Sequence, residues 1–460
     1  MVVAAAAAGK QALVMTELSP LDTGFMEMED TDRHISLGIG AVAIIEGPPP
    51  TRESFRAGLD RGLELHGRLR QRVRRTPWDL AAPVWEDDPK FDLAHHIRWT
   101  ALPEPGDEAA LCELVAVALA ERFDRDHPLW GVVVVENLSG NRWAMIVLAH
   151  HSMVDGISGI TLFESFCDPV ATVPQPARER SSRGGLFGAV ARTVGQSLTV
   201  PGAVVGAVRT LVPVVYWAVA PAPDSSLNGP IGRQRRYVAE RTSLAEVREI
   251  ATDFGVTIND VAVAAITAAY RRLLQIRGET PAPGKLRILV PVSMRADDAK
   301  YIPDNRVSAM IVQLPIEFES PVERLTATHE RIAGHRSRGE AEAEKSLLAL
   351  ADQLPFAVAA WVFRTASRFP QRGVGALATN IPGPRHWLTL GGRKVLEIWP
   401  AIPIAMRVRT TVAILSYADQ LNFGVTGDYD TTPDIDEIAS GIATEIAVLL
   451  AHARGRAHQR

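Results

Sequence analysis

Apolar and polar positions along the first half of the chain follow two periods, that of a strand and that of a helix. The runs typical of strands are 35–45, 132–136 and 143–149, and those typical of helices are 51–66, 107–122 and 156–166. Segment 137–141, between the last two strands, is rich in turn-forming residues. It therefore predicts a β-hairpin.

The second half shows the same two periods. The predicted strands are 235–240, 286–292, 307–316, 412–417 and 421–426, and the predicted helices are one capped by Ser243, one over 256–274 and one starting at Asp434. Glu246 lies three residues after Ser243, the spacing of a capping box. Helices and strands alternate in both halves without a regular βαβ rhythm, which predicts two α/β domains with mixed sheets.

Every second residue from Arg68 to Arg74 is an arginine. Because successive side chains of a strand point to opposite faces, this alternation predicts a strand with four arginines on one face. Such a face is either a solvated surface or a contact for acidic lipid or for the phosphates of a nucleotide carrier.

Length and composition narrow the class of protein. A chain of 460 residues is too long for one ordinary core and predicts two domains of roughly 200 residues each. Hydrophobic residues make up 47% and charged residues 22%, as in a globular protein, and the net charge of −4 does not favour nucleic acid. The two cysteines, Cys112 and Cys167, argue against a disulfide framework and favour a reducing, cytoplasmic setting.

Four segments follow from these patterns. Residues 1–16 are alanine-rich, lack the features of a secretory signal and predict a mobile extension. We expect domains at 17–180 and 226–460, joined by a linker at 181–225. The sequence contains no run of about 20 apolar residues, so it predicts no membrane-spanning helix. The apolar stretch 186–219 is either a bent helix pair packed on the core or a surface resting on a membrane or lipid droplet.

The chemistry is concentrated in His-His-Ser-Met-Val-Asp-Gly at 150–156. The predicted strand before it sends His150 and His151 to opposite faces, so one histidine faces the reaction site and the other packs in the scaffold. Imidazole titrates near neutral pH and suits proton removal from an alcohol. Asp155 either orients that imidazole or braces the loop, and Gly156 permits a backbone geometry that a side chain would block.

The sequence lacks the motifs of zinc-dependent hydrolases, serine hydrolases and nucleotide-binding proteins. The sequence has no His-Glu-x-x-His, no Gly-x-Ser-x-Gly and no Walker or dinucleotide-binding glycine pattern. The alternative at 150–151 is that both histidines are core residues whose hydrogen bonds are satisfied and that neither is catalytic. We interpret the similar pair His95–His96 as part of the scaffold.

The segment at 150–156 matches the HHxxxDG motif of CoA-dependent acyltransferases, and more of the chain resembles one branch of that superfamily. That branch is the bacterial wax ester synthase/acyl-CoA:diacylglycerol acyltransferases, particularly the triacylglycerol synthases. The matching pieces are 18–22, 91–93, 128–130, 227–230, 259–260, 291–295, 305–308, 380–384, 403–406 and 415–419.

The resemblance implies two chloramphenicol-acetyltransferase-like domains with an active-site channel between them. It makes His151, the second histidine of the motif, the proton acceptor, and it makes Asp155, the aspartate of the catalytic motif, a structural brace. Asn259 is a substrate-binding candidate that polarises the thioester carbonyl or orders the channel, or else a helix N-cap. Arg295 is a possible partner of Asp155.

The implied reaction is direct transfer of a long-chain acyl group from acyl-CoA to diacylglycerol, which yields triacylglycerol. Acyl-CoA is a co-substrate, and no cofactor or metal is expected. The alternatives are wax ester synthesis on fatty alcohols, a non-catalytic lipid-binding paralogue and a peptide-forming condensation domain, although the chain contains no carrier domain. We expect a cytoplasmic protein peripheral to membranes or lipid droplets.

Overall fold

The computed structural model describes residues 16–76, 81–168, 224–293, 307–337, 364 and 371–457. Three sequence-based expectations lie outside the described residues: the extension at 1–16 apart from Thr16, the apolar stretch 186–219 and the role of Arg295. The division at 17–180, 181–225 and 226–460 stays a prediction.

One six-stranded sheet belongs mainly to the first half, in the order β12–β13–β2–β7–β6–β5. Its strands are β2 (Gly38–Glu46), β5 (Ile97–Ala101), β6 (Trp130–Leu138), β7 (Arg142–His150), β12 (Thr389–Leu390) and β13 (Arg393–Ala401). β5 and β6 are parallel and the other pairs antiparallel, so the sheet is mixed. The predicted hairpin is confirmed as β6–β7. β13 comes from late in the chain and pairs with β2, so the two halves share this sheet.

Helices cover both faces of this sheet: α2 (Arg52–Leu65) and α4 (Gly156–Phe166) pack on one face and α3 (Glu108–Ala120) on the other. The helix α1 (Pro20–Thr31) lies at the ends of β2 and β7. Alternate residues of β2 divide between two cores: Ala41, Ala43 and Ile45 pack with α2 and α4, whereas Val42 and Ile44 pack with α3. This alternation explains why the predicted strand is apolar on both sides, since both faces are buried.

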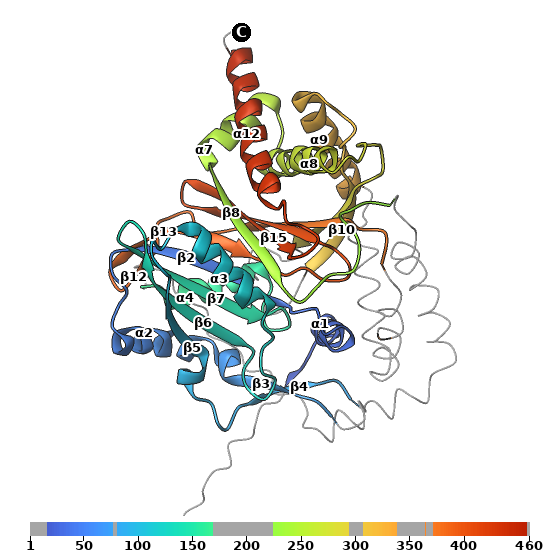
Figure 1. Ribbon diagram of the computed structural model, residues 1–460. Coiled ribbons are helices and arrows are strands. Elements are labelled where there is room, and N and C mark those ends of the chain that lie inside the picture. The colour runs from blue at the N-terminus through green and yellow to red at the C-terminus, as the bar shows by residue number, and fades with distance from the viewer. Residues whose placement is uncertain are drawn as a thin grey trace, which may run out of the picture.

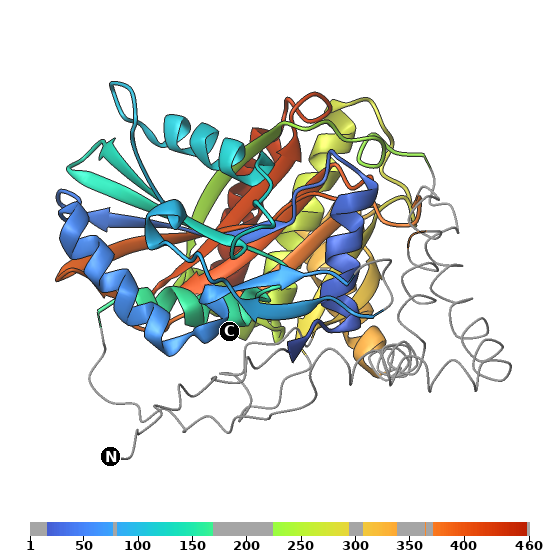
Figure 2. The same ribbon diagram turned by 90° about the horizontal axis from the view of Figure 1, so that it is seen from below.

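The second six-stranded sheet has the order β10–β9–β11–β14–β15–β8. Its strands are β8 (Arg235–Ser243), β9 (Arg287–Ser293), β10 (Val307–Gln313), β11 (Ala376–Pro382), β14 (Thr410–Tyr417) and β15 (Gln420–Asp428). β11 is parallel to both β9 and β14, and the other pairs are antiparallel. Figure 2 shows strands of the two sheets side by side.

One face of the second sheet is covered by α7 (Leu244–Phe254), α8 (Ile258–Ile276), α9 (Pro321–Ser337) and α12 (Asp436–Ala457). Figure 1 shows these helices together above the sheet. Ser243 caps α7 by accepting a hydrogen bond from the Glu246 N–H, as its position predicts. On the other face, Leu415 and Tyr417 pack into the same core as α2 and α4. The uncovered face of the second sheet therefore meets the first half.

The predicted strand with four arginines is wrong. Gly67–Arg70 is the 3-10 helix η1, and only Gln71–Arg74 forms a strand, β3, which pairs with β4 (Val84–Asp87). Leu69 is 2% exposed, and its carbonyl accepts a hydrogen bond from Trp130 Nε1 at 2.8 Å. The 3-10 turn at Gly67–Arg70 therefore interrupts the alternation before the strand begins. Arg72 and Arg74 both pair with Glu86 instead of forming a free basic face.

Among the described helices, none has by itself the length and apolar composition to cross a membrane. The pair α7 and α8 meets that condition only jointly and is bent by 100°. Buried residues of α8 lie in the core between the second sheet and the helices that cover it.

The architecture is the predicted pair of α/β units with mixed sheets.

Candidate active site

The motif at 150–156 begins where β7 ends. His150 is the last residue of β7 and lies opposite Gly38 of β2. The His151 N–H donates to the Leu37 carbonyl at 2.9 Å, and the Met153 N–H donates back to the His150 carbonyl at 2.8 Å. The chain therefore turns immediately after the strand, and the two imidazoles enter different environments.

His150 is held inside the protein and is 1% exposed. Its Nδ1 accepts a hydrogen bond from the Ser152 N–H at 3.1 Å and lies 2.7 Å from Ser152 Oγ. The ring proton consequently lies on Nε2, which faces Glu29 Oε1 at 3.4 Å. His150 is thus a scaffold residue, the role that strand alternation reserves for one of the two histidines.

Glu29 of α1 anchors this scaffold. Its carboxylate accepts hydrogen bonds from the Leu37 N–H at 2.7 Å and from Arg125 at 3.0 Å. Burial by itself raises the pKa of Glu29, but His150, the Leu37 N–H and Arg125 together lower that pKa to about 2. Glu29 therefore stays ionised and ties α1 to the ends of β2 and β7.

His151 lies on the wall of a cavity and stacks on Phe25, with ring centroids 4.1 Å apart. Burial lowers the pKa of His151 to about 4, and the nearby His150 lowers it further, whereas Asp155 opposes the shift. The imidazole is therefore neutral near pH 7 and able to accept a proton. Its catalytic role stays a prediction from sequence.

The cavity has a volume of about 360 Å³ and lies between the two halves. Its walls come from α1, β2, β7 and α4 of the first half and from β9, β11, β14 and residues 400–408 of the second. Among its lining residues, the side chains that carry polar groups are those of His151, Asp155, Thr379 and Thr411. An apolar cavity with a few convergent polar groups is suited to a hydrophobic substrate.

Asp155 acts locally as a helix cap. It is 2% exposed, and one carboxylate oxygen accepts hydrogen bonds from Ser158 N at 2.8 Å and Ser158 Oγ at 2.6 Å. These contacts fix the start of α4, and the role of Asp155 in the catalytic motif stays a prediction. Asp155 also lines the cavity.

Gly156 is needed for space and not for an unusual backbone angle. Its φ lies outside the positive region that favours glycine. A Cβ at this position would lie 2.9 Å from Cδ1 and Cγ1 of Ile381, which also lines the cavity. A side chain would therefore block the local geometry at Gly156, as the sequence predicts, because its absence lets β11 approach α4.

Asn259 lies in the first turn of α8, but the N-cap is Thr257, which forms a capping box with Asp260. The alternative of an N-cap at Asn259 is therefore wrong. Asn259 Oδ1 accepts a hydrogen bond from Asn380 Nδ2 at 3.1 Å. It is not among the described residues that line the cavity, whereas Thr379 and Ile381, on either side of Asn380, are. Substrate binding by Asn259 stays a prediction.

The second histidine pair, His95–His96, lies in the 3-10 helix η3 (Leu93–His96). His96 is buried, stacks on Trp130 and donates from Nδ1 to the Trp130 carbonyl at 2.8 Å. Burial lowers the pKa of His96. His96 is accordingly a packed scaffold residue, as interpreted from the sequence.

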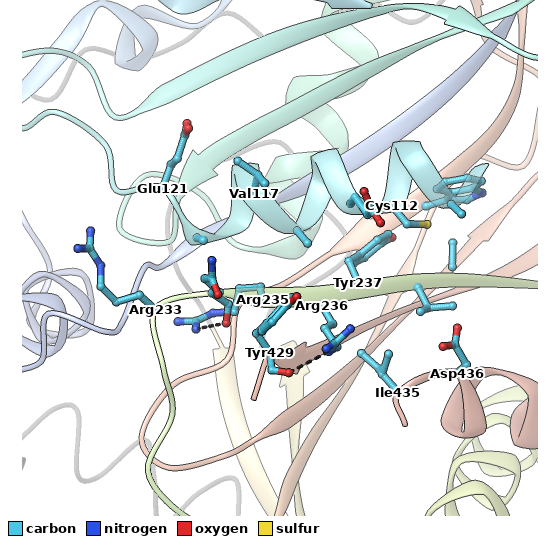
Figure 3. A pocket seen from close by; sticks show the side chains of 18 of the residues that line it. Cys112, Val117, Glu121, Arg233, Arg235, Arg236, Tyr237, Tyr429, Ile435 and Asp436 are labelled. Atoms are coloured by element: carbon cyan, nitrogen blue, oxygen red, sulfur yellow. Dashed lines mark hydrogen bonds between the residues drawn. The ribbon is translucent and has the colours of Figure 1, made fainter. Parts of the chain in front are cut away.

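A larger cleft of about 1320 Å³ lies on the other side of the first sheet, between α3 and β8 (Figure 3). Arg235 lies in this cleft and donates to the carbonyls of Gly232 and Gln234. Burial raises the pKa of the Cys112 thiol to about 12, so this cysteine is a poor nucleophile. The cleft contains no residue of the 150–156 motif, and its charges are mixed in sign.

Across the residues that the structure describes, no group of three or more histidine, cysteine, aspartate or glutamate side chains is arranged to hold a metal ion. Sequence reasoning missed Glu29, Thr379 and Thr411. A glutamate in a helix and threonines in apolar strands are ordinary residues for those elements, so the sequence carried no signal for them.

Comparison with known proteins gives a consistent result. The model of the wax ester synthase/diacylglycerol acyltransferase catalytic domain matches residues 18–262, and that of the WS/DGAT C-terminal domain matches residues 304–449. A probable diacylglycerol O-acyltransferase of Mycobacterium tuberculosis is 44% identical over 451 residues, covering 96% of this chain and 97% of that protein.

Solved structures show the same fold. A wax ester synthase/diacylglycerol acyltransferase from Marinobacter aquaeolei matches with a TM-score of 0.67 at 24% identity, over 95% of this chain and 100% of that one. The starter condensation domain of rhizomide synthetase matches with a TM-score of 0.58 at 15% identity, over 96% and 95% of the two chains.

Proposed function

The chain belongs to the wax ester synthase/diacylglycerol acyltransferase family, and from that premise we propose that it makes triacylglycerol from acyl-CoA and diacylglycerol, with His151 as general base. The observation that carries the mechanism is the position of His151. It is a neutral imidazole on the wall of an apolar cavity to which both halves of the chain contribute.

The proposed step is a direct transfer. His151 takes the proton from the free hydroxyl of diacylglycerol while the hydroxyl oxygen attacks the carbonyl carbon of the thioester. A tetrahedral intermediate forms, with the former π electrons on the carbonyl oxygen. When it collapses, the C–S bond breaks and the departing sulfur receives the proton from His151. No acyl-enzyme and no cofactor is required.

General base catalysis supplies only part of the rate, about 100- to 10,000-fold. The remainder comes from holding two substrates in contact, which the cavity between the halves supports. Asp155 fixes α4 and Glu29 fixes His150, so the strand end that carries His151 is held on both sides.

We also propose that the protein works at the surface of a membrane or lipid droplet, facing the cytoplasm. Diacylglycerol and triacylglycerol are lipids, and the apolar lining of the cavity suits them. The stretch 186–219 is our candidate for the lipid contact, from its composition alone.

The test is a competition between acceptors. Purified protein is given radiolabelled long-chain acyl-CoA with equal amounts of diacylglycerol and hexadecanol in mixed micelles, and the products are separated by thin-layer chromatography. We expect triacylglycerol to predominate. Predominant wax ester would replace the proposed acceptor with a fatty alcohol, and no product from either would indicate a non-catalytic lipid-binding protein.

A further inference from the structure

One hydroxyl group in the cavity has no partner among the described residues. Thr411 lines the cavity and is 1% exposed, and its Oγ makes no hydrogen bond with any residue that the structure describes. Leaving a buried polar group unpaired costs free energy. Because Thr411 also lines the cavity, its unpaired hydroxyl is available to a ligand there.

The strand geometry directs the side chain of Thr411 towards the cavity. β14 lies between β11 and β15 in the second sheet, so its backbone is held on both sides. Thr411 and Leu415 project from the face of β14 that lines the cavity. The adjacent Thr410 projects from the opposite face, where its Oγ lies 2.9 Å from the hydroxyl of Tyr270. The hydroxyl on the helix side is thus satisfied, and the one on the cavity side is not.

We propose that Thr411 is a further catalytic residue, whose hydroxyl donates a hydrogen bond to the carbonyl oxygen of the acyl group as the tetrahedral intermediate forms. This inference rests on the proposed function. His151 lies on the wall contributed by the first half and Thr411 on that contributed by the second. The acyl carbonyl and the acceptor hydroxyl would therefore react between the base and the hydrogen-bond donor.

The other polar side chains of the cavity are less suited to this task. Asp155 is an acceptor when ionised and would repel a developing oxyanion, and its oxygen already binds Ser158. His151 is occupied with the proton of the acceptor hydroxyl. Thr379 is only half-buried, so water can reach it more easily. A desolvated donor such as Thr411 interacts more strongly with a developing charge than a hydrated one.

Thr411 keeps its own proton throughout the reaction. As the hydroxyl oxygen of the acceptor bonds to the carbonyl carbon, the π pair moves to the carbonyl oxygen, and the Thr411 O–H stabilises the resulting charge. On collapse the pair re-forms the C=O bond and the C–S bond breaks. The hydrogen bond then weakens, so its contribution is greatest at the intermediate and at the transition states around it.

The test compares Thr411→Val, which keeps the side-chain shape but removes the hydroxyl, with Thr411→Ser, which keeps the hydroxyl. Thr426→Val is the matched control. Thr426 lies directly across from Thr411 on β15, is 0% exposed and also has no hydrogen-bond partner for its Oγ among the described residues, but it does not line the cavity.

For each variant, kcat and KM for acyl transfer are measured together with the urea midpoint of unfolding. We expect Thr411→Val to lower kcat about 100-fold with KM within about threefold of wild type, because one lost oxyanion donor costs about 100- to 1000-fold. Thr411→Ser is expected to restore most of that loss. Thr426→Val should stay near wild type, and neither valine variant should unfold earlier.

Three outcomes overturn the proposal. Thr411→Val with a kcat within threefold of wild type shows that the hydroxyl is not needed. An equal loss in Thr426→Val assigns the effect to packing of the sheet. A change in KM alone places the hydrogen bond in the ground state. If wild-type protein transfers no acyl group, the proposed function itself fails and takes the role of Thr411 with it.

Discussion

Acidification is expected to inactivate this acyltransferase at a much lower pH than an ordinary histidine base would allow. Burial lowers the pKa of His151 from its usual 6.5 to about 4. At pH 5.5 a histidine with a pKa of 4 is about 97% neutral, whereas one with a pKa of 6.5 is about 9% neutral. The concentration of competent base therefore differs roughly tenfold between the two cases.

The assay is kcat/KM for transfer of a labelled acyl group between pH 4 and 8, because this ratio reports the ionisation of the free enzyme. Circular dichroism at each pH verifies that the protein remains folded. We expect a flat profile down to about pH 5 and an acid limb near pH 4. An acid limb near 6.5 in folded protein would refute the reasoning that burial keeps His151 neutral.

The same shift predicts a change in stability. Because the folded-state pKa lies below the unfolded one, the folded state binds fewer protons between about pH 6.5 and 4. The free energy of unfolding therefore falls as the pH drops through this window and the contribution of His151 levels off below it. Lowering the pH from 7 to 4.5 should reduce the stability of wild type relative to His151→Gln by about 2 kcal/mol. An unchanged difference between the two proteins would contradict this expectation.

Two further variants test the residues that support the base. Asp155→Ala should lower the free energy of unfolding by about 1 kcal/mol because the α4 cap is lost. Asp155→Asn should lower it less, since the amide oxygen still accepts a hydrogen bond from Ser158. Equal urea midpoints for Asp155→Ala and wild type would contradict this expectation. Glu29→Gln should lower stability and kcat together, because it removes the charge that faces His150 and Arg125. The pKa of Glu29 lies at about 2, so its stabilising effect is present at neutral pH and declines as the pH falls from about 4.5 towards 2. Unfolding curves of wild type and Glu29→Gln should accordingly converge on acidification, and a constant gap would argue against this role.

Local patterns were sufficient for much of the fold. The helix at 156–166 and the hairpin before it follow from periodicity and turn residues, because both are formed by neighbours in sequence. Strand alternation also separates His150 from His151 without any knowledge of the cavity. These predictions depend on interactions within about ten residues, which a single sequence records directly.

Contacts between distant segments were not predictable in this way. β13 pairs with β2 across some 350 residues of sequence, and nothing in its composition distinguishes the first sheet from the second. Glu29 reaches His150 only because α1 packs against the end of β7. The arginine alternation was misleading for the same reason: in the 3-10 turn at Gly67–Arg70 the Leu69 carbonyl accepts a hydrogen bond from Trp130, a distant contact that local spacing does not contain.

The central claim is that His151 is the general base. Its most direct test is kcat for transfer of acyl-CoA to diacylglycerol by His151→Gln, compared with wild type and with His150→Gln, each shown to be folded. We predict that kcat falls at least 100-fold in His151→Gln. In His150→Gln we expect kcat to fall only as far as the variant loses stability. A kcat within threefold of wild type for His151→Gln, or a larger loss in a folded His150→Gln protein, would contradict the account.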